Sequence, residues 1–463
     1  MFVGRQNELD FLNNRYNSQG GQLIVLYGRR RVGKTETLRE FCKSKEHVFY
    51  SCTECTDDQQ LKAFSRRILS KDIPAAKYIK EFADWEHALK SIVELPGKGK
   101  KLLVIDEFSY MVKSNSSIPS ILQNLWDSQL KDQSVMIILC GSAMSFIEKE
   151  ILSEKNPLYG RATGILKMKE MDFYDAIKFF PNQTILNKIL SYAVLGGIPH
   201  YLKQFDVSRS IEDNIKTNIL QRGSILYSEV EFLMRQELRE TTVYNTVIGA
   251  VALGNTKLND IYQKTQIDKN KLTVYLKNLI DLGIIEREFP VSDGIKEQAN
   301  VQRGLYQITD NFFRFWYAFV FPNVSELEAG DVDGIYDYAV KPQLDEYTSR
   351  IFETVCRDYL RKLNMQNKLP FHFTKIGRWW DKQNELDIMA TDKEKNHFIL
   401  GECKFKNSDF DLSDMNSTIT KFKSMKKDAK VYYYLFSKSG FTDEVMKTAK
   451  EKDIRLVSVN DLI

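Results

Sequence analysis

The residues best suited to chemistry form a phosphate-binding loop near the start of the chain. The loop has the pattern G-x-x-x-x-G-K-[ST] and consists of Gly28, Arg29, Arg30, Arg31, Val32, Gly33, Lys34 and Thr35. In such a loop the backbone N–H groups surround the phosphates of a nucleotide, and the following helix adds the positive end of its dipole. We expect Lys34 to reach the β- and γ-phosphates and Thr35 to bind Mg²⁺. The pattern therefore predicts a site for Mg-ATP.

Two carboxylates follow a second apolar segment. Residues 102–105 are apolar, and Asp106 and Glu107 come directly after them. The segment predicts a buried strand with the carboxylates at its end. We expect Asp106 to hold the Mg²⁺ shell and Glu107 to orient or deprotonate the attacking water. An accidental match on an unrelated loop is the alternative, and the spacing of the two motifs argues against it.

Further polar residues could assist this site. Ser142 follows the apolar run 138–140 and could hydrogen-bond the γ-phosphate or the water, or it could simply cap a helix. Arg161 could act as an arginine finger or form a structural salt bridge. We expect the arginines of the loop to face solvent, although one of them could guide the nucleotide.

A second group of charged residues lies near the C-terminus. Asp387 belongs to a predicted strand, and Glu402 and Lys404 belong to a later one. The period of two in a strand places Glu402 and Lys404 on one face, and a hairpin would bring Asp387 to the same end. The two carboxylates could hold Mg²⁺ or Mn²⁺, and Lys404 could activate water. A solvated hairpin is the alternative, but the apolar residues around Glu402 favour a core strand.

Strands and helices alternate in the first third of the chain. Apolar runs predict strands at 22–27, 48–52, 101–105 and 135–140, with helical periodicity between them. This alternation predicts an α/β fold whose parallel sheet has helices on both faces. Strand patterns disappear from 171 to 250, where we expect helices. Near the C-terminus, a helix and a smaller α/β module follow, with strands at 371–376, 385–390, 398–404 and 431–436.

The region between these parts has the pattern of a winged helix-turn-helix. The predicted elements are helices at 258–265 and 269–282, closed by Gly283, and strands at 284–289 and 305–308. Polar residues of the second helix could contact DNA, namely Asn270, Lys271, Thr273 and Lys277. Basic and acidic residues balance between 240 and 288, however, whereas a DNA-binding module usually has a basic face. A structural or regulatory role therefore remains the alternative.

The composition fits an ordinary soluble protein. The 463 residues include 66 basic and 62 acidic side chains, so bulk charge does not indicate a nucleic-acid binder. Six cysteines are too few for a disulfide framework and fit a reducing compartment. Cys52 and Cys55 form a lone C-x-x-C that is either structural or a metal or redox site. The most apolar stretch, 312–321, is well short of the ~20 residues that span a bilayer. We expect a cytoplasmic protein with no membrane partner.

The motifs resemble those of the archaeal-type P-loop ATPases, a family of the STAND branch near the AAA+ proteins. The resemblance rests on Gly4-Arg5, Glu8-Leu9, the loop 28–35, Asp106-Glu107, the stretch 157–161 and the stretch 196–199. It covers nearly the whole chain, because members often carry a winged helix and a nuclease-like C-terminal domain. It implies that the turn at Gly197 and Pro199 reports the nucleotide state from a helical lid. Ala143 departs from the pattern, in which a second serine is expected.

The C-terminal motif resembles the PD-(D/E)xK nuclease superfamily. Glu353 resembles the helix carboxylate that many members carry, and in similar nucleases a backbone carbonyl at the position of Cys403 completes the metal shell. The resemblance implies a restriction-endonuclease-like α/β domain, either an intact nuclease or a degenerate form of the fold. The predicted order of domains is a P-loop ATPase core (1–170), a helical lid (171–240), a winged helix (241–310), a connector (311–345) and the nuclease-like domain (346–463).

Together these patterns predict a STAND-type ATPase whose nucleotide state controls a metal-dependent nuclease-like domain. The cofactors would be ATP and Mg²⁺, with Mn²⁺ as an option at the nuclease-like site. The partner would be nucleic acid, DNA rather than RNA, and by analogy foreign DNA. Self-association into a homo-oligomer is left open. The alternative is an ATP-dependent DNA-binding regulator or protein scaffold with a catalytically dead nuclease fold.

Overall fold

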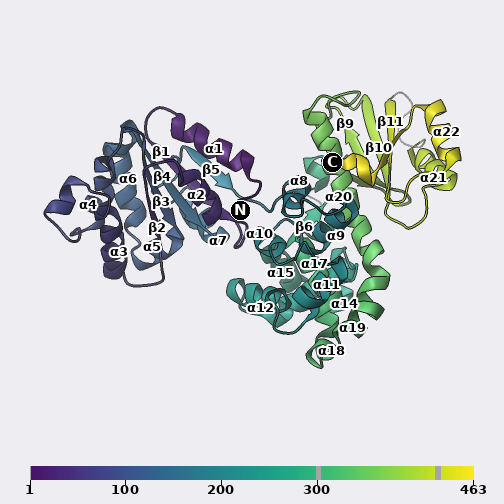
Figure 1. Cartoon of the computed structure of the whole chain (residues 1–463), viewed down its shortest axis with the longest axis horizontal. Coiled ribbons are helices and arrows are strands. Elements are labelled where there is room, and N and C mark those ends of the chain that lie inside the picture. The colour runs from purple at the N-terminus through teal and green to yellow at the C-terminus, as the bar shows by residue number, and fades with distance from the viewer. Residues whose placement is uncertain (1, 299–303, 423–428) are drawn as a thin grey trace. The chain divides into compact units, whose positions relative to one another are not determined.

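The computed structural model describes residues 2–298, 304–422 and 429–463 (Figure 1). The chain divides into two compact units. The first comprises Met1–Met171 and Ile198–His200, and the second comprises Asp172–Gly197 and Tyr201–Ile463. Residues 299–303 of the predicted winged helix and 423–428 of the predicted nuclease-like domain lie outside the described residues.

A parallel sheet forms the centre of the first unit. Its order is β2-β3-β4-β1-β5, and all neighbouring strands are parallel. The strands are β1 (Gln22–Tyr27), β2 (His47–Ser51), β3 (Lys101–Asp106), β4 (Val135–Gly141) and β5 (Gly164–Lys167). β1 and β4 are buried along their whole length, as expected for central strands covered on both faces. The predicted α/β fold with a parallel sheet is confirmed.

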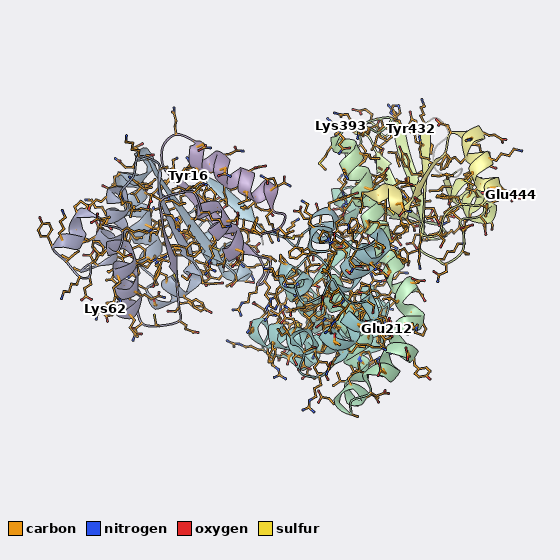
Figure 2. The ribbon with its side chains drawn as sticks, viewed as in Figure 1. Tyr16, Lys62, Glu212, Lys393, Tyr432 and Glu444 are labelled. Atoms are coloured by element: carbon orange, nitrogen blue, oxygen red, sulfur yellow. The ribbon has the colours of Figure 1, made fainter. Side chains whose placement is uncertain are left out.

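Helices cover this sheet. They are α1 (Gln6–Asn17), α2 (Lys34–Cys42), α3 (Asp57–Leu69), α4 (Trp85–Lys90), α5 (Phe108–Ser114), α6 (Ile118–Ser128) and α7 (Met144–Phe146). Tyr16, labelled in Figure 2, anchors α1: its hydroxyl donates to the carbonyl of Lys100 (2.9 Å), and its ring packs edge-on against Phe41 of α2. Helix α1 therefore supports α2, the helix that starts at Lys34.

The strand order determines where the functional residues meet. β4 lies between β1 and β3 in the sheet. Because the carboxyl ends of parallel strands lie along one edge, Ser142 after β4 falls between the phosphate-binding loop after β1 and the carboxylates after β3. The site of an open α/β sheet forms at such an edge.

The second unit begins with helices. They are α8 (Phe173–Ala176), α9 (Ile185–Leu195), α10 (Pro199–Leu202, whose first two residues belong to the first unit), α11 (Ile211–Ile215), α12 (Ile225–Glu237), α13 (Thr241–Ala252), α14 (Leu258–Thr265) and α15 (Lys269–Asp281). Gly283 has a φ of 68° and ends α15 in the left-handed conformation, as predicted. β6 (Ile285–Glu288) and β7 (Leu305–Ile308) form an antiparallel pair, with α16 (Ile295–Gln298) between them. The predicted helices and strands are present, and their assignment to a winged helix stays a prediction.

Short helices then lead to a long one. α17 (Asn311–Phe315), α18 (Val324–Glu328) and α19 (Val332–Ile335) precede α20 (Leu344–Met365). Trp316 is buried, and its indole N–H donates to the carbonyl of Tyr227 (2.8 Å). None of the helices in the described ranges is long and apolar enough to cross a membrane.

A mixed sheet ends the chain. Its order is β12-β11-β10-β9-β8, with β8 to β10 antiparallel and β10 to β12 parallel. The elements are β8 (Lys375–Trp380), β9 (Glu385–Thr391), β10 (His397–Lys404), α21 (Leu412–Phe422), β11 (Lys430–Ser437), α22 (Asp443–Lys452) and β12 (Arg455–Ser458).

The strand predicted at 371–376 is wrong in position. β8 begins only at Lys375, because the side chain of Asn364 on α20 captures the backbone before it. The amide of Asn364 accepts from the N–H of Phe373 (3.0 Å) and donates to its carbonyl (3.1 Å), so neither group is available to a sheet.

Candidate functional site

The phosphate-binding loop is closely packed. A Cβ on Gly28 would lie 2.3 Å from the carbonyl oxygen of Met168, so only glycine fits there. Gly33 has a φ of 94° and is the N-cap of α2. The buried ammonium of Lys34 donates to the carbonyls of Gly28 (2.8 Å) and Arg29 (3.0 Å). Burial lowers the pKa of Lys34, and nearby acidic groups, Cys140 and Glu107 first among them, oppose this shift. An anionic phosphate group would offer this ammonium a stronger partner than two carbonyls.

Thr35 and Asp106 are joined directly. The hydroxyl of Thr35 donates to Asp106 Oδ2 (2.8 Å), and Asp106 is buried at the end of β3. A hydroxyl and a carboxylate are hard oxygen ligands of the kind that Mg²⁺ prefers, and Mg²⁺ usually keeps several waters beside phosphate oxygens. The two residues therefore fit the role of holding Mg²⁺ that the sequence predicted.

Glu107 has an unusual backbone and a single clear side-chain partner. Its φ of 53° and ψ of 44° are left-handed, which costs about 1–2 kcal/mol for a residue with a Cβ. Its carboxylate accepts a 2.8 Å hydrogen bond from the hydroxyl of Ser142. Ser142 does not cap a helix, because the N-cap position of α7 is Ala143, without a side-chain cap. Strain of this kind is typical of functional sites, since the surrounding structure must impose it.

Arg5 and Pro199 lie against the loop, and of these two only Arg5 was outside the predicted set of site residues. Arg5 is buried and donates to the carbonyl of Val32 (2.7 Å) and to Glu8 Oε1 (2.8 Å). The sequence signal for Arg5 was its place beside Gly4, three residues before Glu8. Pro199, which is predicted to report the nucleotide state, lies where its Cγ would be 3.6 Å from a Cβ on Gly33. The residues Ile198–His200 group with the first unit, although the chain on both sides of them belongs to the second.

The predictions made for Arg161 and for the three arginines of the loop have different outcomes. Arg161 forms a bidentate pair with Asp127, from Nε to Oδ1 at 3.0 Å and from Nη2 to Oδ2 at 2.7 Å. This favours the salt bridge over the arginine finger. The expectation that Arg29, Arg30 and Arg31 face solvent is wrong, because all three are half-buried where the loop turns back at Arg31 (φ 69°).

The C-terminal carboxylates lie together on adjacent strands. Gly401 pairs with Ile388, which places Glu402 opposite Asp387. Asp387 Oδ2 accepts from the N–H of Cys403 (2.8 Å), and the ammonium of Lys404 donates to Glu402 Oε1 (2.8 Å). Burial, together with the charges of Glu353 and Glu402, raises the pKa of Asp387 to about 8. The structure thus brings the three predicted residues together at one end of β9 and β10.

The carboxylate of Glu353 pairs with arginine side chains. Its Oε2 lies 3.7 Å from Arg357 and 3.5 Å from Arg378. Arg378 also pairs with Glu385 and with Glu288 of β6 (2.9 Å). Within the described ranges, no group of three or more His, Cys, Asp or Glu side chains is arranged to hold a metal ion. The metal ligands that fit are the two carboxylates Asp387 and Glu402, whose mutual repulsion a cation would relieve.

The predicted DNA-contacting residues are exposed on α15: Asn270, Lys271, Thr273 and Lys277. The segment after β6 is instead engaged with the C-terminal sheet. The N–H of Val291 donates to the carbonyl of Arg378 (2.9 Å), and Val291 packs on the cluster of Trp379 and Met389. Cys52 is buried, as the structural interpretation expects, and Cys55 is half-buried.

A glycine-rich loop with a buried lysine, a hydroxyl–carboxylate pair and a second carboxylate, all at one edge of a parallel sheet, define a P-loop ATPase. Residues 2–205 match a family described as an ATPase domain predominantly from Archaea, and residues 316–418 match a family of archaeal and bacterial proteins of unknown function. The chain is 37% identical over 415 residues to an uncharacterized protein of Methanocaldococcus jannaschii, covering 89% of each chain. The chain belongs to the same family as this protein, and its N-terminal part is an archaeal-type ATPase domain.

Two solved structures are similar in part. A Walker-type ATPase of Pyrococcus abyssi has 20% identity and a TM-score of 0.49, with 68% of this chain and 96% of that chain covered. The ORC2 protein of Aeropyrum pernix has 13% identity and a TM-score of 0.42, with 72% and 94% covered.

Proposed function

We propose that the nucleotide state of this ATPase controls a metal-dependent nuclease centre in its C-terminal part. One observation carries the proposal: Asp387, Glu402 and Lys404 converge on adjacent strands, with Glu402 buried and Asp387 half-buried. Two acidic side chains in such a place repel one another, and the protein gains by binding a cation between them. An ordinary solvated hairpin has no such arrangement.

At the nucleotide site, each residue has a separate task. Lys34 neutralises the β- and γ-phosphates, and Thr35 and Asp106 are the residues that would hold the Mg²⁺ shell. Glu107 orients the attacking water and accepts its proton, and Ser142 keeps the carboxylate of Glu107 in place. Pro199, which lies beside Gly33, responds to the nucleotide state of the loop.

At the C-terminal site, the substrate is a phosphodiester, which is anionic and repels a hydroxide nucleophile. Asp387 and Glu402 would hold a divalent cation, which would supply positive charge at the scissile phosphate. Lys404 polarises the water that adds to phosphorus, the bond from phosphorus to the leaving sugar oxygen breaks, and the proton lost by the water returns through solvent to that oxygen. Arg357 and Arg378 pair with Glu353, whose charge acts on Asp387 and would tune the centre without a role as metal ligand.

The second candidate is a DNA-binding regulator with an inactive C-terminal site. The exposed polar residues of α15 favour it. The balanced charge of that region and the engagement of Val291 with the C-terminal sheet favour a structural role instead. We therefore place the nuclease first.

The test is incubation of the full chain with linear, circular and single-stranded DNA, and with RNA, in Mg²⁺ or Mn²⁺, with and without ATP. We expect cleavage that requires metal, responds to ATP and is lost in Asp387→Ala and Lys404→Ala. Glu444→Ala is the matched control, because Glu444 is an exposed acidic residue of α22 (Figure 2). Absence of cleavage in every condition would leave the regulator as the better function.

A further inference from the structure

Glu402 is contacted by two lysines from different elements. Lys404 of β10 donates to its Oε1 at 2.8 Å. Lys421 of α21 lies 3.4 Å from Oε2 and 3.5 Å from Oε1. The second contact is longer and therefore weaker than the first, since hydrogen bonds of ammonium to carboxylate are strongest near 2.8 Å. Lys421 lies 19 residues beyond Glu402, and nothing in the sequence pattern singled it out.

Lys421 lies on the side of α21 that faces the protein. Met415 and Thr418 on the same helix are fully buried. Residues three or four apart share a helix face, so Lys421 follows Thr418 toward the sheet. Its side chain is 26% exposed, whereas lysines usually keep their ammonium in water. An inward lysine at a carboxylate centre therefore needs an explanation beyond solubility.

The charges of the centre supply one. Two ammonium groups contact the single carboxylate of Glu402, which leaves a local excess of positive charge on that side. When a divalent cation takes the oxygens of Glu402, both ammonium groups meet a second positive charge. An anionic ligand beside the cation then becomes a favourable neighbour of Lys421, the ammonium with the longer contact to Glu402.

We propose that Lys421 is a phosphate-binding residue of this centre, which contacts a non-bridging oxygen of the scissile phosphodiester while Lys404 serves the water. The proposal rests on the nuclease function proposed above. It names a substrate contact from α21, an element outside the strand pair that holds the carboxylates. Lys421 takes no part in binding the metal.

The first test measures metal binding without nucleic acid or nucleotide. Mn²⁺ is titrated into the full chain and into the variants Lys421→Ala, Glu402→Gln and Lys447→Ala. Because Lys421 repels a cation, its removal should leave Mn²⁺ affinity unchanged or tighten it, whereas Glu402→Gln should weaken it. Lys447 is an exposed lysine of α22 and serves as the control.

The second test measures binding of a DNA duplex in Ca²⁺ at several salt concentrations, and cleavage in Mn²⁺. Loss of one phosphate contact should reduce the slope of log affinity against log salt by about 0.9. Cleavage by Lys421→Ala should fall about 10²-fold, as when one preorganised donor is removed from a transition state. Lys421→Arg keeps the charge and should retain most of both.

The outcomes separate the two claims. Cleavage and salt slope equal to wild type in Lys421→Ala would overturn this inference and leave the nuclease function standing. Weaker Mn²⁺ binding in Lys421→Ala would assign the lysine to the support of Glu402 and also overturn it. A wild-type chain that binds no Mn²⁺ at Glu402 and cuts no nucleic acid would remove the nuclease function and the inference together.

Discussion

The hydroxyl of Ser142 donates a 2.8 Å hydrogen bond to Oε2 of Glu107, across two adjacent strands of the sheet. The N–H of Ser142 lies 3.4 Å from the same oxygen. Glu107 is thus held at its side chain by the end of β4 while its own backbone is in a left-handed conformation. The carboxylate that should activate water depends on a residue far from it in the sequence.

We predict that Ser142→Ala lowers ATP turnover. A hydrogen bond to a charged group contributes about 1.5–3 kcal/mol, so its loss should reduce the rate about tenfold or more, with nucleotide affinity nearly unchanged. Steady-state hydrolysis and an ATP titration measure the two effects. Ser114→Ala is the control, because the hydroxyl of Ser114 donates a hydrogen bond to a backbone carbonyl of α5. Turnover at the wild-type rate would show that Glu107 positions itself without Ser142.

The two acidic residues after β3 should fail in different ways. Glu107→Gln keeps its size and its bond to Ser142 but cannot accept a proton, so hydrolysis should slow by about 10²–10⁴ while ATP still binds. Asp106→Asn should instead weaken the dependence on Mg²⁺, because Asp106 contacts Thr35. The measurement is turnover against Mg²⁺ concentration. If the two variants behave alike, the assignment of separate roles is wrong.

Nucleotide binding should depend on Lys34. Lys34→Ala removes the buried ammonium that contacts the carbonyls of Gly28 and Arg29, and we expect binding to be abolished or nearly so. A fluorescent ATP analogue titrated into the variant measures this, after circular dichroism has shown that it folds. Lys43→Ala is the control, since Lys43 is exposed one residue past the end of α2. Unchanged affinity in the folded variant would contradict the loop assignment.

Arg161 should matter little to hydrolysis. It pairs with Asp127 on both oxygens, so Arg161→Ala and Asp127→Ala should give the same small effect on turnover. An arginine finger would instead contribute about 10³–10⁵ to the rate. Turnover of the two single variants and the double variant distinguishes these cases. A large loss confined to Arg161→Ala would restore the finger.

Arg378 should be important for stability. It pairs with the half-buried carboxylates of Glu288 and Glu353, and its removal leaves them only the longer contacts with Arg350 and Arg357. We expect Arg378→Ala to lower the midpoint of the unfolding transition that ATP does not shift. Thermal unfolding with and without ATP identifies that transition. The exposed Arg455 of β12 provides the control variant Arg455→Ala, which should leave the midpoint unchanged.

Local patterns were sufficient for the nucleotide site. The loop 28–35 and the pair Asp106-Glu107 are contiguous in sequence, so their chemistry can be recognised without the fold. The contact of Ser142 with Glu107 could not be predicted, because it depends on β4 lying between β1 and β3 in space. The side-chain pairing of Arg161 with Asp127 likewise joins separate elements.

The secondary structure was predictable where hydrophobic runs are long. β1 is a mostly apolar run of six residues, and both of its ends were predicted correctly. The short edge strand β5, which contains Gly164 and Lys167, gave no hydrophobic signal. The error at 371–376 came from one side chain, because Asn364 binds the backbone that apolar residues would otherwise place in a sheet. Such competition is not visible in a pattern of hydrophobicity.

The segment after β6 has a consequence for the history of the gene. Val291 packs on the hydrophobic cluster of the C-terminal sheet, and Glu288 pairs with Arg378 of β8. A recombination event that exchanged only the residues from α20 onward would leave Val291 and Glu288 without these partners. The two modules should therefore be inherited as one block. Breakpoints that natural chimaeras tolerate should fall before α13, not in the stretch between β7 and α20.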